Sequence, residues 1–307
     1  MLLEQTVHKA DSESSYPDNR DERLKIQKAL NQFYLDVFSS PDLLVAKNLN
    51  VVHSDIASVE AKWLDYELAR ISNYELPQKV GDFREWYLTL AAKQDAATDS
   101  FVTFIAEEAR REQIALFFLC EAQVDSKFDD LIALAQVGTS GSVKMAIARN
   151  YWDEMGNGRP HLVHTTMFDR SAQYMSQVLS GTRFDVTTIV SPETYANANQ
   201  LMCYSFYRMF NPRLIGALGI LEQCAPRRFA AMIDGCTRVG VPADVVKYQK
   251  VHIAIDQKHG DEWLDQVLHP LVNKSTALMH QVCVGALTRF NVATDYYTYV
   301  TEALRSF

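Results

Sequence analysis

The sequence predicts an all-α protein, and two observations support this fold class. Apolar residues recur at helical spacing along most of the chain from Glu22 onward. Alternating apolar and polar residues, which are typical of strands, are nearly absent, and only residues 183–190 carry a β-branched run. We therefore expect one helical domain over residues 21–307. A flexible tail is expected over residues 1–20, where Ser, Asp, Asn and Pro are frequent.

The expected helices follow one another with short breaks. The first carries an apolar stripe from Leu24 to Val37 and ends before the SSPD segment at 39–42. Another clear start is Ser191, an expected N-cap followed by Pro192 at the first helical position and Glu193 in the first turn. The remaining helices are expected over residues 54–73, 82–95, 100–122, 128–136, 142–156, 162–179, 192–210, 212–223, 227–239, 243–259, 261–276, 278–287 and 293–305.

Composition argues against several classes of partner. The net charge is −8 and no basic stripe is present, so we expect no nucleic-acid partner. No apolar run reaches the roughly 18 residues that a membrane span needs, and the N-terminus lacks the features of a signal peptide. The five cysteines are odd in number, show no CxxC spacing and mostly lie in apolar runs, which favours reduced thiols in the cytoplasm.

The most informative segment is KVHIAIDQKHGDEW, in which His252, Asp256 and His259 have the spacing HxxxDxxH. On a helix, Asp256 lies about 40° from His252, and His259 lies about 20° on the other side. All three side chains therefore share one face, and their apolar neighbours predict that this face is buried. Burying two imidazoles and a carboxylate is costly without a cation or a proton network. A metal site is the simpler explanation, and an exposed helix is the alternative.

Two further segments offer ligands. Glu154 ends a strong helical pattern and is followed by His161 and His164, but the intervening glycines and proline leave open which histidine returns to it. The alternative for this segment is a glycine-capped helix end with histidines near the helix dipole. Glu121 follows the apolar run IALFFLC, and Asp125 lies one turn later on the same face.

Together these segments carry carboxylates and imidazoles that a helical bundle can bring to one dinuclear centre. Such mixed ligands suit iron or manganese, whereas the absence of paired cysteines argues against structural zinc. None of the eight histidines is preceded three residues earlier by a glutamate, so the two ExxH pairs of ferritin-like proteins are missing. A different helical diiron scaffold is needed.

The order Glu121, then Glu154 and His164 ten residues apart, then HxxxDxxH resembles the heme-oxygenase-like diiron oxidases and oxygenases, over roughly residues 100–270. The resemblance implies a bundle of about seven core helices without heme, here with extra N-terminal helices. It implies two Fe²⁺ ions as cofactor and O₂ as co-substrate. The implied ligands, which are also the implied catalytic residues, are Glu121, Glu154, His164, His252, Asp256 and His259. Glu222 is a weaker candidate for a further carboxylate, and His161 is the rival of His164.

The resemblance also implies an oxidation such as N-oxygenation, desaturation or C–C cleavage. We expect a small, amino-acid-derived substrate in natural-product metabolism. The alternatives are a fatty-acid-type oxidative decarboxylase of the same family, or a metal-free enzyme of the thiaminase or cofactor-free oxidase branch of the fold. Arg183, Arg208 and Arg213 are candidates for binding a substrate carboxylate, although such arginines are more often at the surface or ion-paired. The sequence leaves open an external electron donor and a homodimer.

Overall fold

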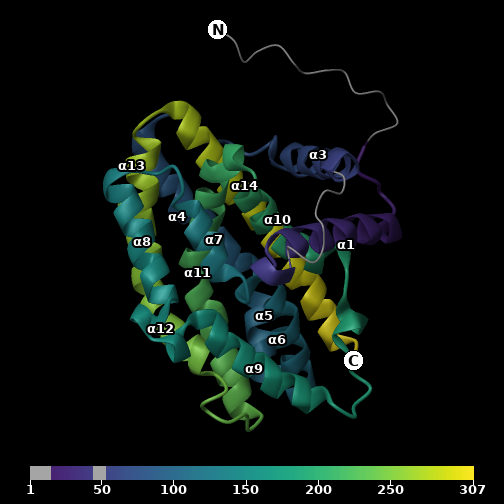
Figure 1. Ribbon diagram of the computed structural model, residues 1–307. Coiled ribbons are helices and arrows are strands. Elements are labelled where there is room, and N and C mark those ends of the chain that lie inside the picture. The colour runs from purple at the N-terminus through teal and green to yellow at the C-terminus, as the bar shows by residue number, and fades with distance from the viewer. Residues whose placement is uncertain (1–14, 44–52) are drawn as a thin grey trace.

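The computed structural model describes residues 15–43 and 53–307, and the chain in these ranges is almost entirely helical (Figure 1). Thirteen α-helices and no β-strand lie within the described residues. The predicted all-α fold is therefore confirmed. Residues 1–14 of the expected tail lie outside the described residues, and the first helix begins at Arg20.

The helices have the following bounds. The N-terminal ones are α1 (Arg20–Val37), α3 (His53–Ile71), α4 (Val80–Ala97) and α5 (Asp99–Thr103). The middle ones are α6 (Arg111–Asp125), α7 (Phe128–Ala135), α8 (Gly141–Glu154), α9 (His164–Leu179) and α10 (Pro192–Phe206). The C-terminal ones are α11 (Asn211–Arg238), α12 (Lys247–Glu262), α13 (His269–Val272) and α14 (Thr276–Arg305). Short π-helical segments occupy Phe104–Glu108 and Trp263–Leu268.

The long helices α11 and α14 pack directly against each other in the middle of the bundle (Figure 1). Two glycines allow this close approach. A Cβ atom on Gly216 of α11 would lie 2.1 Å from the carbonyl oxygen of Val282, and one on Gly285 of α14 would lie 2.0 Å from that of Arg213. Any larger residue would push the helices apart. Because α12 also packs on α11, the helix with the HxxxDxxH spacing is held against this central pair.

Two helices are longer than the sequence predicts. Helix α11 continues through Pro226, where we expected a break, and α14 continues through residues 288–292. Proline removes one backbone hydrogen bond, but packing against α14 and α12 holds α11 together across this gap. In α14, the Thr288 hydroxyl donates to the Val284 carbonyl and Arg289 is anchored to Asn197, so tertiary contacts override weak helix propensity.

Three other predictions from the sequence, a helix cap, a β-branched run and the absence of a membrane span, can be compared with the structure. The Ser191 cap is confirmed, since its hydroxyl accepts from the Thr194 amide and Pro192 opens α10. The β-branched run at 183–190 forms no strand, and Val186–Ile189 is a 3₁₀ helix capped by Asp185. No helix among the described residues combines the length and the apolar character that crossing a bilayer requires.

Candidate metal centre

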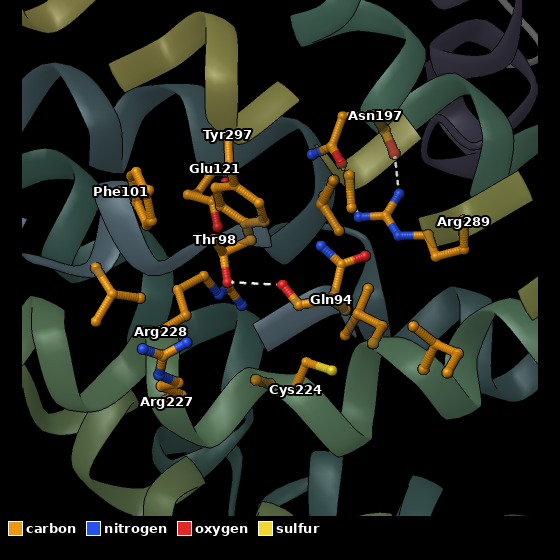
Figure 2. Close-up of a pocket in the computed structure, with 16 residues that line it drawn as sticks. Gln94, Thr98, Phe101, Glu121, Asn197, Cys224, Arg227, Arg228, Arg289 and Tyr297 are labelled. Atoms are coloured by element: carbon orange, nitrogen blue, oxygen red, sulfur yellow. Dashed lines mark hydrogen bonds and ion pairs between the residues drawn. The ribbon is translucent and has the colours of Figure 1, made fainter. Parts of the chain in front are cut away.

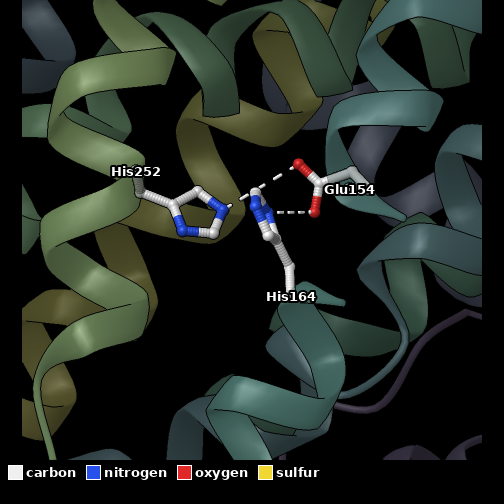
Figure 3. A group of neighbouring side chains, drawn as sticks. All are labelled: Glu154, His164 and His252. Atoms are coloured by element: carbon white, nitrogen blue, oxygen red, sulfur yellow. Dashed lines mark ion pairs between the residues drawn. The ribbon is translucent and has the colours of Figure 1, made fainter. Parts of the chain in front are cut away.

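Three buried side chains from three helices converge in the bundle (Figure 3). Glu154 is the last residue of α8, His164 is the first residue of α9, and His252 lies in α12. One potential ligand atom from each lies within 4.8 Å of the other two. Glu154 Oε2 is 2.7 Å from His164 Nδ1, and Glu154 Oε1 is 3.9 Å from His252 Nε2. Each of the three residues is at most 3% exposed. The structure thus brings together residues that are up to 98 positions apart in the chain.

The turn between α8 and α9 places His164, and not His161, beside Glu154. Gly156, Asn157 and Gly158 all adopt positive φ, which reverses the chain within a few residues. A Cβ on Gly156 would lie 2.5 Å from the backbone carbon of Leu162, so only glycine fits there. His161 is exposed in the following 3₁₀ turn. The ambiguity between the two histidines is therefore removed by the glycine turn.

The hydrogen bonding of His252 leaves one ring nitrogen free to bind a cation. Its Nδ1 lies 2.9 Å from the Tyr248 carbonyl, which can only accept, so Nδ1 carries the proton. The lone pair is then on Nε2, the atom that faces Glu154. Burial, reinforced by His164, lowers the pKa of His252 well below its usual value. The imidazole is therefore neutral, as metal ligation requires.

A second pair of ligand-type residues adjoins the first group. Glu222 of α11 has its Oε2 atom 3.9 Å from His259 Nδ1, and its Oε1 accepts a hydrogen bond from Asn150 at 3.2 Å. Asp153, next to Glu154, lies 3.1 Å from His259 Nε2. Burial raises the pKa of Glu222 to about 7, although His259 acts to lower it. The negative charge of Glu154 raises it further, as expected for two buried carboxylates that lie close together.

The remaining residues of the expected ligand set are placed differently. Glu121 does not join the group of three, because it accepts a hydrogen bond from Tyr296 at 2.6 Å and pairs with Arg228. Asp125, one turn later, lines a small cavity together with Glu222 and His252. Burial and the charge of Glu154 raise its pKa to about 8. Asp256 lies in α12, but its side chain is outside the described residues.

Sequence reasoning missed the residues that support the ligands. Asp153 stands directly before Glu154, and Tyr248 stands one helical turn before His252. Only the second relation is a usable signal, because a carbonyl four residues before a helical histidine is within reach of its ring. Asn150 gave no such signal, because its partner Glu222 is 72 residues away in the chain.

The chemistry of these side chains fits an iron ion. Both oxygens of Glu154 are buried, and no donor among the described residues makes a well-aligned hydrogen bond to either. A buried carboxylate that lies beside imidazole nitrogens without a well-aligned hydrogen bond is typical of a site that holds a cation. Two imidazoles and a carboxylate are also a ligand set that non-heme iron takes.

Comparison with known proteins agrees with this geometry. A family model described as "iron-containing redox enzyme" matches residues 115–294, well over half of the 307-residue chain. The match includes Glu154, His164, Glu222, His252 and His259. No curated protein matches the chain. The family is heme-oxygenase-like in fold, as the sequence predicted, and its members are oxidoreductases. The chain therefore belongs to the heme-oxygenase-like family of iron-containing redox enzymes.

Proposed function

We propose that the protein is a non-heme diiron enzyme that uses O₂ to oxidise a small organic substrate. The observation that carries this proposal is the buried group of Glu154, His164 and His252, with Glu222 and His259 directly beside it. A single ion would use only the first three residues. The adjoining pair supplies a second set of nitrogen and oxygen donors, and this supports a dinuclear centre.

In this proposal, Glu154, His164 and His252 hold one iron, and Glu222 and His259 hold the other. Asp256 joins them on the strength of the family resemblance. Asp125 is a closer candidate than Glu121, since it shares a cavity with Glu222 and His252. Glu121 can serve as a ligand only by leaving Arg228 and Tyr296.

Bound iron would supply the capacity to reduce O₂ and to oxidise the substrate. The protein's own groups prepare the site for it. The Tyr248 carbonyl fixes the tautomer of His252, and Asp153 positions His259. Burial of Glu154, His164 and His252 keeps bulk water away from the reacting centre.

The cysteines give no support to the metal-free alternative. All five are free, and four of them are buried. Burial raises the pKa of the Cys120, Cys236 and Cys283 thiols to about 12, and it also raises those of Cys203 and Cys224. Thiols with such pKa values carry very little thiolate at neutral pH, so they are poor nucleophiles. Free, reduced thiols also agree with the cytoplasmic location that we propose.

Anaerobic loading of the purified protein with Fe²⁺ tests the proposal. We expect about two irons per chain, which is the dinuclear stoichiometry, and a transient visible absorption after O₂ is admitted. A His252→Ala variant should lose iron, while His280→Ala, which changes an exposed histidine, should load normally. A wild-type protein that binds no iron, or a His252→Ala variant that loads fully, would refute the assignment.

The substrate class that we propose is small and amino-acid-derived, in keeping with the family resemblance. Oxygen uptake by the iron-loaded protein, measured with and without each candidate compound, tests this separately. A true substrate should accelerate the uptake and be consumed. Acceleration by long-chain fatty acids, and not by amino-acid derivatives, would contradict it.

A further inference from the structure

A cavity of about 50 Å³ lies beside the candidate metal centre, between α4, α5, α6, α10, α11 and α14 (Figure 2). Part of its wall is apolar and includes Phe101, Val124, Ile220 and Ala293. Several polar side chains also line it, and Gln94 and Arg289 are nearly buried, at 3% and 4% exposure. An apolar wall with a few convergent polar groups is the lining that small-molecule sites have.

Arg289 is a buried cation whose hydrogen-bond partners are all neutral. Its two terminal nitrogens donate to the backbone and side-chain oxygens of Asn197, each at 2.7 Å. No carboxylate of the described residues makes an ion pair with it. The neighbouring Arg228, by contrast, contacts both Glu121 and Asp125. Asp125 attracts this guanidinium without making an ion pair with it, and an anion in the cavity would supply the direct ionic partner that a buried guanidinium needs.

Gln94 gives a second, independent indication of a ligand. Both polar atoms of its side-chain amide are buried, and neither has a hydrogen-bond partner among the described residues. Figure 2 shows this amide directed into the cavity, in the neighbourhood of Arg289. Unpartnered buried amides are uncommon in folded proteins, because each lost hydrogen bond destabilises the fold. A ligand in the cavity would satisfy this amide.

A second, smaller cavity adjoins the first on the side of the metal centre. The two cavities share Leu221, Ala225 and Arg228 in their walls. The smaller one is also lined by Glu222 and His252, which belong to the candidate metal centre. A molecule bound at Arg289 would therefore lie one shared wall away from the candidate iron ligands.

We propose that Arg289 and Gln94 bind the carboxylate group of a small organic acid, whose apolar body runs along the cavity wall toward the metal centre. The guanidinium fork and the amide N–H suit a carboxylate, which accepts several charge-assisted hydrogen bonds. A phosphate dianion fits less well, since Arg228 is already paired with carboxylates. The binding site stands on the cavity alone. That the bound acid is the substrate rests on the proposed function.

Ligand binding is tested with the full chain, with and without iron, by calorimetry and thermal unfolding. The probes are straight-chain monocarboxylates, apolar L-α-amino acids, the primary amide of each, and inorganic phosphate. We expect at least one carboxylate to bind and to raise the unfolding temperature, and its amide to bind about 10- to 100-fold more weakly, because one charge-assisted interaction is lost. Equal binding of acid and amide, preferential binding of phosphate, or no binding of any acid would each overturn the proposal.

Three variants locate the binding group. Arg289→Met and Gln94→Met should each weaken the best carboxylate, by about 10-fold or more for the arginine. Gln94→Met should also stabilise the ligand-free protein, because it removes two unpartnered buried polar atoms. The matched control is Arg227→Met, because Arg227 lines the same cavity but is partly exposed and pairs with Asp99. It should retain the affinity.

Two results would contradict this location. One is unchanged carboxylate affinity in Gln94→Met, a variant that we expect to fold because the Gln94 amide makes no hydrogen bond in the ligand-free protein. The other is loss of affinity in Arg227→Met. Iron content, measured on the same samples, separates this inference from the proposed function. If the protein binds carboxylates but no iron, the carboxylate site stands and the diiron proposal is refuted. If it binds iron but no carboxylate, the diiron proposal stands and the carboxylate site is refuted.

Discussion

Replacing Gly156 with alanine tests whether the turn after α8 builds the metal centre. Gly156 has φ +61°, and an added Cβ would lie 2.5 Å from the backbone carbon and 2.6 Å from the backbone oxygen of Leu162. The left-handed conformation costs an alanine about 1–2 kcal/mol. The overlap adds about 1–3 kcal/mol, toward the upper end because backbone atoms cannot rotate away. We therefore expect Gly156→Ala to lower the free energy of unfolding by about 2–5 kcal/mol.

Gly141 provides a matched control at the other end of α8. Its φ is +59°, but an added Cβ would meet open space, with no neighbouring group within 4 Å. Gly141→Ala should therefore cost only the conformational term of about 1–2 kcal/mol. Urea unfolding of both variants gives the difference. Anaerobic iron loading should be reduced in Gly156→Ala alone, because opening the turn moves His164 away from Glu154. Equal destabilisation of the two variants, together with full iron loading of Gly156→Ala, would refute the reasoning.

Three further predictions follow from individual contacts. His164→Ala should lower the iron content by about one ion per chain, whereas His161→Ala, at an exposed position, should leave it unchanged, as metal analysis can show. Asp153→Asn should weaken binding of the second iron about 10- to 100-fold in an Fe²⁺ titration, since it removes the charged partner of His259; unchanged affinity would contradict this. Burial raises the pKa of Glu67 from 4.5 to about 7, so its protonated form stabilises the fold below pH 4.5 and this stabilisation is lost as the pH rises to 7. In the wild type, the free energy of unfolding should therefore fall by about 3 kcal/mol across this pH range, and Glu67→Gln should abolish the fall in urea unfolding. An unchanged dependence of the unfolding free energy on pH in the variant would contradict this.

The fold was predictable because it depends on a periodic signal that runs through the whole chain. The limits of individual helices were less predictable, since they depend on neighbours that are distant in sequence. Pro226 marks a helix end by local rules, yet α11 passes through it while packed between α12 and α14. In the same way, the β-branched residues at 183–190 have no neighbouring strand to pair with, and they form a 3₁₀ turn.

The candidate site was predictable where one helix or one turn sets the geometry. The HxxxDxxH spacing places His252 and His259 on one face, and the ten residues from Glu154 to His164 form a single reversal of the chain. The choice between Glu121 and Asp125 could not be made in this way. It depends on the rotation of α6, and Glu121 is held by Arg228 and Tyr296 from two helices far along the chain.

The carboxylate-binding arginine that we propose was also hidden from sequence reasoning. The expected candidates Arg183, Arg208 and Arg213 donate to oxygens elsewhere, those of Phe307, Leu134 and Gln281. Arg289 lies inside a long amphipathic helix, where it resembles any other polar position. Its burial results from the close contact of α14 with α10 and α11.

Helix α11 lines both cavities, and this couples the contents of the larger cavity to the candidate metal centre. Leu221 lines both cavities, while its neighbour Glu222 lines the smaller one and contacts His259. Pro226 has no N–H to offer the Glu222 carbonyl, so the helix is least restrained by its own hydrogen bonds at this point. We therefore expect the proposed acid, when it contacts Leu221, to shift Glu222 as well. The ferrous spectrum should change when the cavity fills, before any oxygen is admitted.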